Sequence, residues 1–467
     1  MKLAPFTWRR VFVLALVVKI LLAAIIPLSN DEAYYWVWSH HLQWSYYDHP
    51  AAVAWLFWLG HLFEPLRHLF PGHDLTGVVR IPAVIIGHLS LLVFKKIVGD
   101  SISEKQHVQW LIVVLLSPFF GIGSLIVTPD IPLILTWSLS LLAFKRYIEA
   151  PGAKTAALLG AALGAGFCSK YHIVLFVPVA IAYVVWKQQW RLFRPASLLS
   201  VIVMGLICSA PVWGWNAAHD WISFKFQLNH GLAHEATSLD KMLQQFGDYS
   251  GAQLALLSPL VVFTFWKFSE PKELRFLRWF GWGPILFFAY TSLRSPVEAN
   301  WPIASHLPLL VLASINDTKK YLSRFMISLW TVVSLIAVYQ GLNPERDLFG
   351  VPAKDLKTHE FVRFRDLEAE AEKNSTLFAS SYQMAGALSI ATNRTVPKLA
   401  GLNRLDFFDY DASGYPTTTA FTVALNEAWP WPAWIAARGF AESSRRTVGS
   451  FTLVTFTTTN DSTKAAP

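Results

Sequence analysis

Two adjacent carboxylates follow the first long apolar run, in the segment Asn30-Asp31-Glu32-Ala33-Tyr34-Tyr35-Trp36. A carboxylate at a membrane surface can take the proton of an attacking hydroxyl, so Asp31 and Glu32 are candidate catalytic residues. Tyr35, beside them, is a candidate substrate contact. The simpler interpretation is that the pair caps a helix, because Asp and Glu favour helix N-termini. The sequence leaves both interpretations open.

The segment Tyr46-Tyr47-Asp48-His49-Pro50 places a carboxylate beside an imidazole. Such groups bind divalent metal ions. The later polar segment 216–251 contains His219, His230 and His234, which are candidate metal ligands or simply loop residues. Tyr46 and His49 are candidate substrate contacts. The alternative is that Asp48 and His49 only form a turn.

Isolated cations in other polar breaks are candidate phosphate ligands. Lys170 lies in Ser169-Lys170-Tyr171-His172, and Arg294 begins a segment that continues to Glu298 and Asn300. Asp130, in Thr128-Pro129-Asp130, is a candidate partner in the same phosphate site, while Glu298 and Asn300 are candidate acceptor contacts. The alternatives are a snorkelling Lys170, a capping Asp130 and an Arg294–Glu298 pair.

The elements that position these residues are membrane helices. The chain has 467 residues, 54% of them hydrophobic and 15% charged, with a mean hydropathy of +0.38. This composition is too apolar for an ordinary soluble protein. The net charge of +8 comes from short Lys and Arg clusters between apolar runs, which excludes a nucleic-acid-binding stripe. The sequence contains no Gly-rich strand-turn-helix unit, and this argues against an enzyme that uses a nucleotide sugar.

Apolar runs begin at Val11 and near Val78, Val108, Ile131, Thr155, Ile173, Leu198, Ala252, Leu277, Trp301 and Phe325. They predict about eleven spans with a cytoplasmic N-terminus, because this parity places the basic clusters inside and the candidate site outside. Residues 29–77 then form the first outer loop, and the stretch 51–70 is predicted to be interfacial.

The sequence after Gln340 is too polar to span a bilayer. Residues 376–379 and 450–457 have strand patterns, and Ser381 suits a helix N-cap. We therefore expect two domains. Residues 1–340 form an all-α polytopic membrane domain, and residues 341–467 form a small mixed α/β soluble domain on the outer face.

The ordered motifs from Asp31-Glu32 to Val297-Glu298-Ala299-Asn300-Trp301-Pro302 resemble the bacterial polyprenyl-phosphate-sugar-dependent membrane glycosyltransferases. These are related to protein O-mannosyltransferases and to the lipid A aminoarabinose transferase. The resemblance implies a type C fold with two interfacial helices in the first outer loop. It also implies that Asp31 is the catalytic carboxylate and that Asp48 and His230 hold a divalent metal.

This sequence departs from the resemblance at three places. His49 stands where the aminoarabinose enzymes have a lysine, Ala51 replaces a proline, and Ala33-Tyr34 lacks the arginine that those enzymes have there. Aminoarabinose is therefore not the expected sugar.

The predicted function is an inverting transfer of sugar from a polyprenyl-phosphate donor to a glycolipid such as lipid A, or to a protein. The predicted location is the inner membrane, with the site facing the periplasm and with lipid but no nucleic acid as partner. A glycan ligase or polymerase is the alternative enzyme. A flippase would instead have charges near the midplane of repeated helices.

Overall fold

The computed structural model describes residues 7–70, 75–232, 238–257, 261, 263–266, 268–317 and 320–458. The chain forms two compact units, one of residues 1–26 and 43–339 and the other of residues 27–42 and 340–467. The sequence analysis placed residues 27–42 in the membrane domain. The structure groups them with the C-terminal residues because the helix that they contain packs there.

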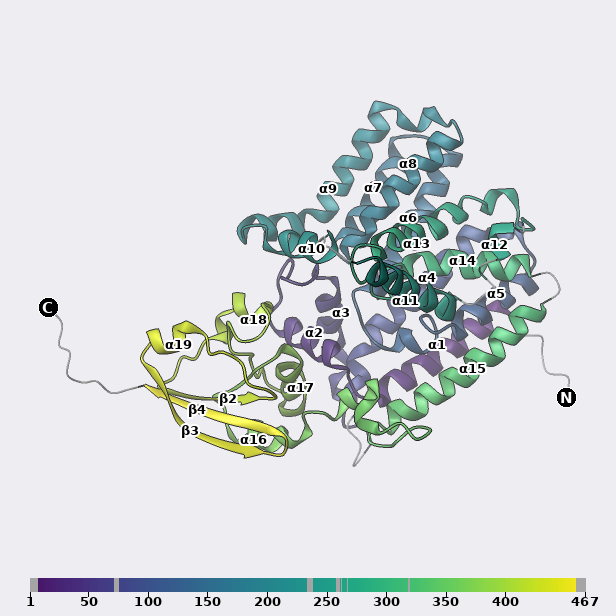
Figure 1. Cartoon of the computed structure of the whole chain (residues 1–467). Coiled ribbons are helices and arrows are strands. Elements are labelled where there is room, and N and C mark those ends of the chain that lie inside the picture. The colour runs from purple at the N-terminus through teal and green to yellow at the C-terminus, as the bar shows by residue number, and fades with distance from the viewer. Residues whose placement is uncertain are drawn as a thin grey trace. The chain divides into compact units, whose positions relative to one another are not determined.

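The first unit is helical (Figure 1). Its α-helices are α1 (Trp8–Ile25), α3 (Ala52–Gly60), α4 (Ile81–Val98), α5 (Glu104–Leu116), α6 (Asp130–Glu149), α7 (Ala153–Phe167), α8 (Phe176–Trp186), α9 (Pro195–Ala218), α10 (Ile222–Leu232), α11 (Leu239–Leu257), α12 (Phe263–Trp266), α13 (Leu277–Ser292), α14 (Ile303–Asn316) and α15 (Tyr321–Leu342). Short 3-10 turns include Thr76–Arg80 before α4 and Tyr171–Leu175 before α8.

Every apolar run that predicts a span contains one of these helices, and the run near Ala252 is helical as far as Leu257. Within the described ranges, four helices are long and apolar enough to cross a membrane: Thr76–Ser101, Asp130–Glu149, Pro195–Ala218 and Tyr321–Leu342. A fifth span results if Trp8–Ile25 and Asn30–His40 are counted together. The chain is thus a multi-pass membrane protein, while the number of spans and their orientation stay predictions.

Small residues bring α7 and α9 together, and the two helices run side by side in Figure 1. A Cβ atom on Gly160 would lie 2.2 Å from the carbonyl oxygen of Val201, and one on Gly164 would lie 2.4 Å from that of Gly205. Glycines four residues apart allow such close backbone contact between membrane helices. This packing fixes the end of α7, after which Lys170 follows.

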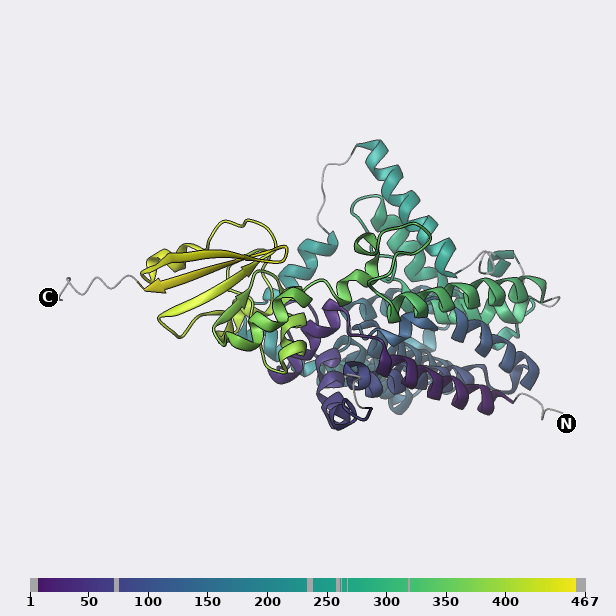
Figure 2. The same cartoon turned by 90° about the horizontal axis from the view of Figure 1, so that it is seen from below.

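The second unit contains α2 (Asn30–His40), α16 (Glu368–Lys373), β1 (Leu377–Ala379), α17 (Tyr382–Thr392), α18 (Phe407–Tyr410), β2 (Ala420–Leu425), α19 (Ala433–Ala437), β3 (Phe440–Val448) and β4 (Phe451–Thr458). The four strands form one sheet in the order β1-β2-β4-β3. The strands near the C-terminus are drawn in yellow in Figure 2. β1 pairs with β2 in parallel, and the other pairs are antiparallel. The predicted mixed α/β composition is confirmed.

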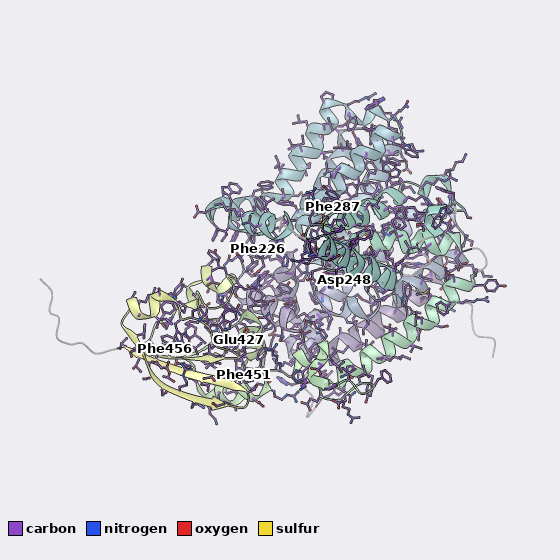
Figure 3. The ribbon with its side chains drawn as sticks, in the orientation of Figure 1. Phe226, Asp248, Phe287, Glu427, Phe451 and Phe456 are labelled. Atoms are coloured by element: carbon purple, nitrogen blue, oxygen red, sulfur yellow. The ribbon has the colours of Figure 1, made fainter. Side chains whose placement is uncertain are left out.

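The sequence explains the strand order. β2 and β4 are largely buried, and Phe421 of β2 stacks on Phe456 of β4 at a centroid distance of 5.2 Å. Figure 3 labels Phe456 and Phe451, both from β4. β3 lies at the edge and carries exposed charges, including Glu442 and Arg445, which oppose pairing with other chains.

Helix α17 packs on α2. The Ser381 hydroxyl accepts a hydrogen bond from the Met384 amide, which confirms the predicted N-cap. A Cβ atom on Gly386 would lie 2.8 Å from the backbone nitrogen of Tyr34. Only glycine allows this approach, and it holds α2 against the C-terminal residues.

Candidate functional site

A buried polar cluster joins three motifs of the first unit that are far apart in sequence. The Lys170 ammonium lies 2.7 Å from Oδ1 of Asp130, and the Asn300 amide donates to Oδ2 of Asp130 at 2.7 Å. The side chains of Lys170 and Asp130 are only 8% and 4% exposed. Both cations and carboxylates are costly to bury unless they are paired, so this ion pair is an integral part of the packing.

Local structure places Asp130 at the first residue of α6, where the positive end of the helix favours a carboxylate. The hydroxyl of Thr128 accepts a hydrogen bond from the Asp130 amide at 3.3 Å and donates to Oδ2 of Asp130 at 3.4 Å. No described side chain caps α6 by a hydrogen bond, so the structure does not give Asp130 the capping role of the simpler interpretation. The two shortest contacts of the Asp130 carboxylate are those with Lys170 and Asn300. It orients these two donors and is not itself a ligand that would attract phosphate.

The loop that contains Tyr46, Asp48 and His49 closes on itself. The Tyr46 amide donates to the His49 carbonyl at 3.1 Å, and the fully buried Tyr46 hydroxyl accepts from the Gln43 amide. The Ala52 amide donates to the carbonyl of Cys168 at 3.1 Å, which fixes the loop at the end of α7. Tyr46 therefore shapes the loop from inside.

This loop also brings His49 to the neighbourhood of Lys170. The buried imidazole of His172 feels the charges of both His49 and Lys170, so the three residues share one region of the first unit. The structure thus brings together His49, Lys170, Asp130 and Asn300 from four of the predicted motifs.

The fit of a divalent metal was tested at Asp48. Its side chain is buried, and its backbone carbonyl accepts a hydrogen bond from Gln227 of α10 at 2.6 Å. Phe226 of the same helix contacts Tyr47 at a centroid distance of 4.7 Å. His230 follows three residues after Gln227 in α10, and its side chain lies outside the described residues. Among the side chains that are described, no group of three or more His, Cys, Asp or Glu residues is placed to hold a metal.

The segment from Arg294 to Asn300 connects α13 and α14. The Arg294 guanidinium is exposed, bonds to the Tyr290 hydroxyl and lies 4.6 Å from the centroid of that ring. Glu298 is also exposed. Gln253 of α11 donates to the Ala299 carbonyl at 2.9 Å, which fixes the backbone beside Asn300.

In the second unit, α2 separates the roles of the two adjacent carboxylates. Glu32 is fully buried and accepts a hydrogen bond from the Ser29 amide at 2.9 Å, while the Ser29 hydroxyl accepts from the Glu32 amide. These contacts form a capping box. Glu32 is therefore the third-position partner of the N-cap residue Ser29, although the sequence analysis counted it with Asp31 as catalytic.

Asp31 is exposed, and its Oδ1 accepts a hydrogen bond from the Tyr382 hydroxyl at 3.2 Å. Tyr35, by contrast, is buried and packs edge to face on Trp38. The Glu360 carboxyl also lies near Asp31. Burial raises the pKa of Glu360, the ion pair with Lys357 lowers it, and the charges of Asp31 and Glu32 raise it.

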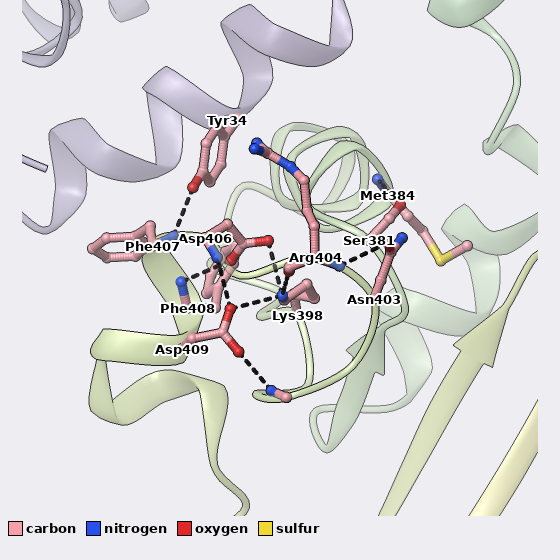
Figure 4. Close-up of polar contacts among 11 residues, drawn as sticks. Tyr34, Ser381, Met384, Lys398, Asn403, Arg404, Asp406, Phe407, Phe408 and Asp409 are labelled. Atoms are coloured by element: carbon pink, nitrogen blue, oxygen red, sulfur yellow. Dashed lines mark hydrogen bonds and ion pairs between the residues drawn. The ribbon is translucent and has the colours of Figure 1, made fainter. Parts of the chain in front are cut away.

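A loop in the same unit presents Arg404 to Tyr382. The Arg404 guanidinium lies 4.5 Å from the centroid of the Tyr382 ring, a cation–π distance. The loop is held by the fully buried Lys398, whose ammonium contacts the Arg404 carbonyl at 2.7 Å and the carboxylates of Asp406 and Asp409, each at 2.9 Å (Figure 4). The Phe407 amide donates to the Tyr34 hydroxyl at 2.8 Å, which ties the loop to α2. The result is a group of the exposed Asp31 and Arg404 with the partly buried Tyr382 between them.

Two charged residues near these clusters were missed by the sequence analysis. Glu360 has no sequence signal that separates it from other acidic residues of the polar tail. Lys19 does have one, because it is the single charge in the otherwise apolar stretch Val11–Leu28. It was overlooked because the whole stretch reads as an ordinary first span.

Part of the first unit is similar in sequence to a family of sugar transferases. Residues 48–215 match the family described as dolichyl-phosphate-mannose-protein mannosyltransferase. The lipid A galacturonosyltransferase RgtD of Rhizobium johnstonii is 22% identical over 295 residues, which make up 61% of this chain and 59% of that protein. The undecaprenyl phosphate-alpha-4-amino-4-deoxy-L-arabinose arabinosyl transferase of Pseudomonas paraeruginosa is 30% identical over 212 residues, or 39% of this chain and 37% of that protein. The chain therefore spans less than two thirds of these relatives.

Solved structures extend the likeness to nearly the whole chain. The crystal structure of ArnT from Cupriavidus metallidurans bound to undecaprenyl phosphate has a TM-score of 0.63 and 13% identity, and covers 98% of this chain and 99% of ArnT. The apo structure of the same protein has a TM-score of 0.62 and 14% identity. This chain has the same fold.

Proposed function

We propose that this chain, which is related by sequence and fold to the polyprenyl-phosphate-sugar membrane glycosyltransferases, transfers a sugar from a polyprenyl-phosphate donor to a hydroxyl of a glycolipid such as lipid A. The names of its relatives support this donor and this acceptor. The site lies on the periplasmic face of the inner membrane, as the distribution of basic clusters favours. The same chemistry with a different acceptor would glycosylate a protein. With a different donor it would transfer a whole glycan.

The observation that carries the proposal is the exposed carboxylate of Asp31, which Glu32 relieves of the capping role. In the reaction, the acceptor oxygen bonds to the anomeric carbon while the bond from that carbon to the phosphate oxygen breaks. The acceptor proton passes to Asp31, and polyprenyl phosphate leaves. A single base without a covalent nucleophile inverts the anomeric configuration.

The leaving phosphate requires positive charge. Lys170 supplies it from a side chain that Asp130 holds in place, and the exposed Arg294 supplies a second cation. Asn300 donates a hydrogen bond to the other oxygen of Asp130. In this proposal Asn300 and His49 contact the sugar. Glu298, exposed on the same segment as Arg294, contacts the acceptor in this proposal.

Arg404 and Tyr382 are proposed to bind the acceptor beside Asp31. We expect Arg404→Ala to raise the acceptor KM about tenfold with little change in kcat, because a charge-assisted contact to an anionic glycolipid is lost. Steady-state kinetics with varied acceptor measure this. Arg438→Ala is a matched control, since Arg438 is also exposed and lies 5.1 Å from the ring of Tyr415. An equal rise of the acceptor KM in both variants would contradict the assignment of Arg404 to acceptor binding.

A divalent cation at Asp48 and His230 is also part of the proposal, supported by the contact between the Asp48 loop and α10. When bound, it would supply Lewis-acid stabilisation of the phosphate. Treatment with a chelator is expected to lower the transfer rate, and added metal to restore it in the wild type but not in Asp48→Ala. Full activity of a protein shown to be metal-free would contradict the proposed cation site at Asp48 and His230.

The proposed function is tested by mass spectrometry of envelope glycolipids from cells with and without the gene. We expect one glycolipid to lose the mass of a single sugar when the gene is deleted and to regain it with the wild-type gene. Loss of a block of several sugars would indicate a ligase or polymerase. No change in any glycolipid or glycoprotein would contradict the transferase.

A further inference from the structure

Lys19 is a charged residue buried inside the first unit. It lies in α1, within the sequence Val17-Val18-Lys19-Ile20-Leu21, and is 9% exposed. Its ammonium donates a hydrogen bond to the carbonyl oxygen of Phe120, in the connection between α5 and α6. An ammonium has three N–H donors, and within the described part of the chain one of them has an acceptor.

A lysine in this position needs an explanation. A lysine near the end of a membrane helix usually extends its side chain to the headgroup region, whereas Lys19 turns into the protein. Charged residues inside a membrane domain are costly and mark binding sites or transport pathways. One carbonyl oxygen is weak compensation for a buried ammonium.

Lys19 lines a cavity of about 280 Å³. The cavity wall also includes Thr128, Asp130 and Asn300, which belong to the cluster around Lys170, and apolar side chains such as Leu91 and Ile134. A water molecule occupies about 30 Å³, so the cavity is large enough for a phosphate group together with part of an apolar chain.

The charges around the cavity do not balance. Among the described residues that line the cavity, Asp130 carries the carboxylate. This carboxylate is already paired with Lys170 at 2.7 Å. His88 lies near enough to feel the charge of Lys19, but its ring bonds to the Phe12 carbonyl at 2.9 Å and can add no negative charge. Lys170 does not line the cavity, but its ammonium neutralises Asp130, so the ammonium of Lys19 is left without a counter-ion in the described wall and favours an anion.

We propose that this cavity is an anion-binding site in which Lys19 holds the phosphate of a polyprenyl-phosphate lipid. The inference rests on the proposed function, because that function supplies a ligand with one anionic group and an apolar chain. Lys19 and Asp130 line the same space, so Lys19 is a further cation for the lipid phosphate, in addition to Lys170, which Asp130 holds in place. A free inorganic anion would share the chemistry of the headgroup but not the apolar part of the wall.

The test measures binding and not transfer. Purified full-length protein in nanodiscs is titrated with polyprenyl phosphate, with polyprenol that lacks the phosphate, and with inorganic phosphate. We expect Lys19→Met to weaken binding of polyprenyl phosphate about tenfold to a hundredfold, as the loss of a charged hydrogen bond predicts, and Lys19→Arg to weaken it less. Lys154→Met, which removes an exposed lysine at the start of α7, is the control and should bind as the wild type does.

The outcomes separate this inference from the proposed function. Unchanged affinity in a folded Lys19→Met variant would overturn the inference, even if the enzyme transfers sugar. If Lys19→Met does not fold, the wild type decides, because equal binding of polyprenyl phosphate and polyprenol would also overturn it. Equal competition by inorganic phosphate at similar concentration would show a site for a free anion instead. Phosphate-dependent lipid binding through Lys19 without any sugar transfer would preserve the inference and refute the transferase.

Discussion

Asp31→Asn is expected to reduce the transfer rate at least about a hundredfold while the protein expresses and inserts normally. The expected size comes from general-base catalysis, which contributes typically about a hundredfold to ten-thousandfold. Asn keeps the shape of the side chain and can still accept the hydrogen bond from Tyr382, but it cannot accept the proton of the acceptor hydroxyl. Initial rates at saturating donor and acceptor measure the effect.

Glu32→Gln is the matched control, one residue away on the same helix. Gln also suits the third position of a capping box, so this change preserves the contacts with Ser29 and should leave the rate within a few-fold of the wild type. The opposite pattern, with Asp31→Asn active and Glu32→Gln inactive, would move the base to Glu32. Activity in both variants would end the assignment of this motif to catalysis.

Lys170→Met is expected to show the second largest effect, on stability as well as on activity. It leaves the carboxylate of Asp130 buried without its cation, and breaking a buried ion pair in this way costs about 3–5 kcal/mol. The thermal unfolding midpoint of the purified protein should fall clearly. Lys95→Met is the control, because Lys95 and Glu104 form a partly exposed pair at 3.7 Å that is worth about 0–1 kcal/mol.

The double variant Asp130→Asn with Lys170→Met separates stability from function. It removes both charges and should recover much of the lost stability, because no unpaired charge remains. Activity should not recover, since the ammonium for the leaving phosphate is absent. Recovery of both properties would show that Lys170 is purely structural.

The helices were predictable from the sequence because each needs only a local signal. A long apolar run is sufficient to place α6 or α9, and alternation with turn residues is sufficient to place β4. Ser381 was equally predictable, since an N-cap depends on residues within one turn.

Partners across long stretches of sequence could not be predicted. Asp130 and Lys170 each looked like a separate phosphate ligand, and only the fold, which brings residues 40 positions apart to 2.7 Å, pairs them. Asp31 and Glu32, by contrast, differ in a local signal that the sequence analysis missed, because Ser29-Asn30-Asp31-Glu32 has the capping-box pattern that assigns Glu32 to the cap. The packing of α2 on α17 depends on Gly386, about 350 residues away, and carries no local signal.

The most direct test of the account is a reconstituted reaction that follows both products. Purified protein in lipid vesicles is given a polyprenyl-phosphate sugar and an acceptor glycolipid, and the released polyprenyl phosphate and the glycosylated acceptor are counted together. The account predicts one polyprenyl phosphate for each sugar transferred, with inverted anomeric configuration, and almost none of either product with Asp31→Asn. Movement of the intact donor across the vesicle membrane without glycosylated acceptor would contradict it.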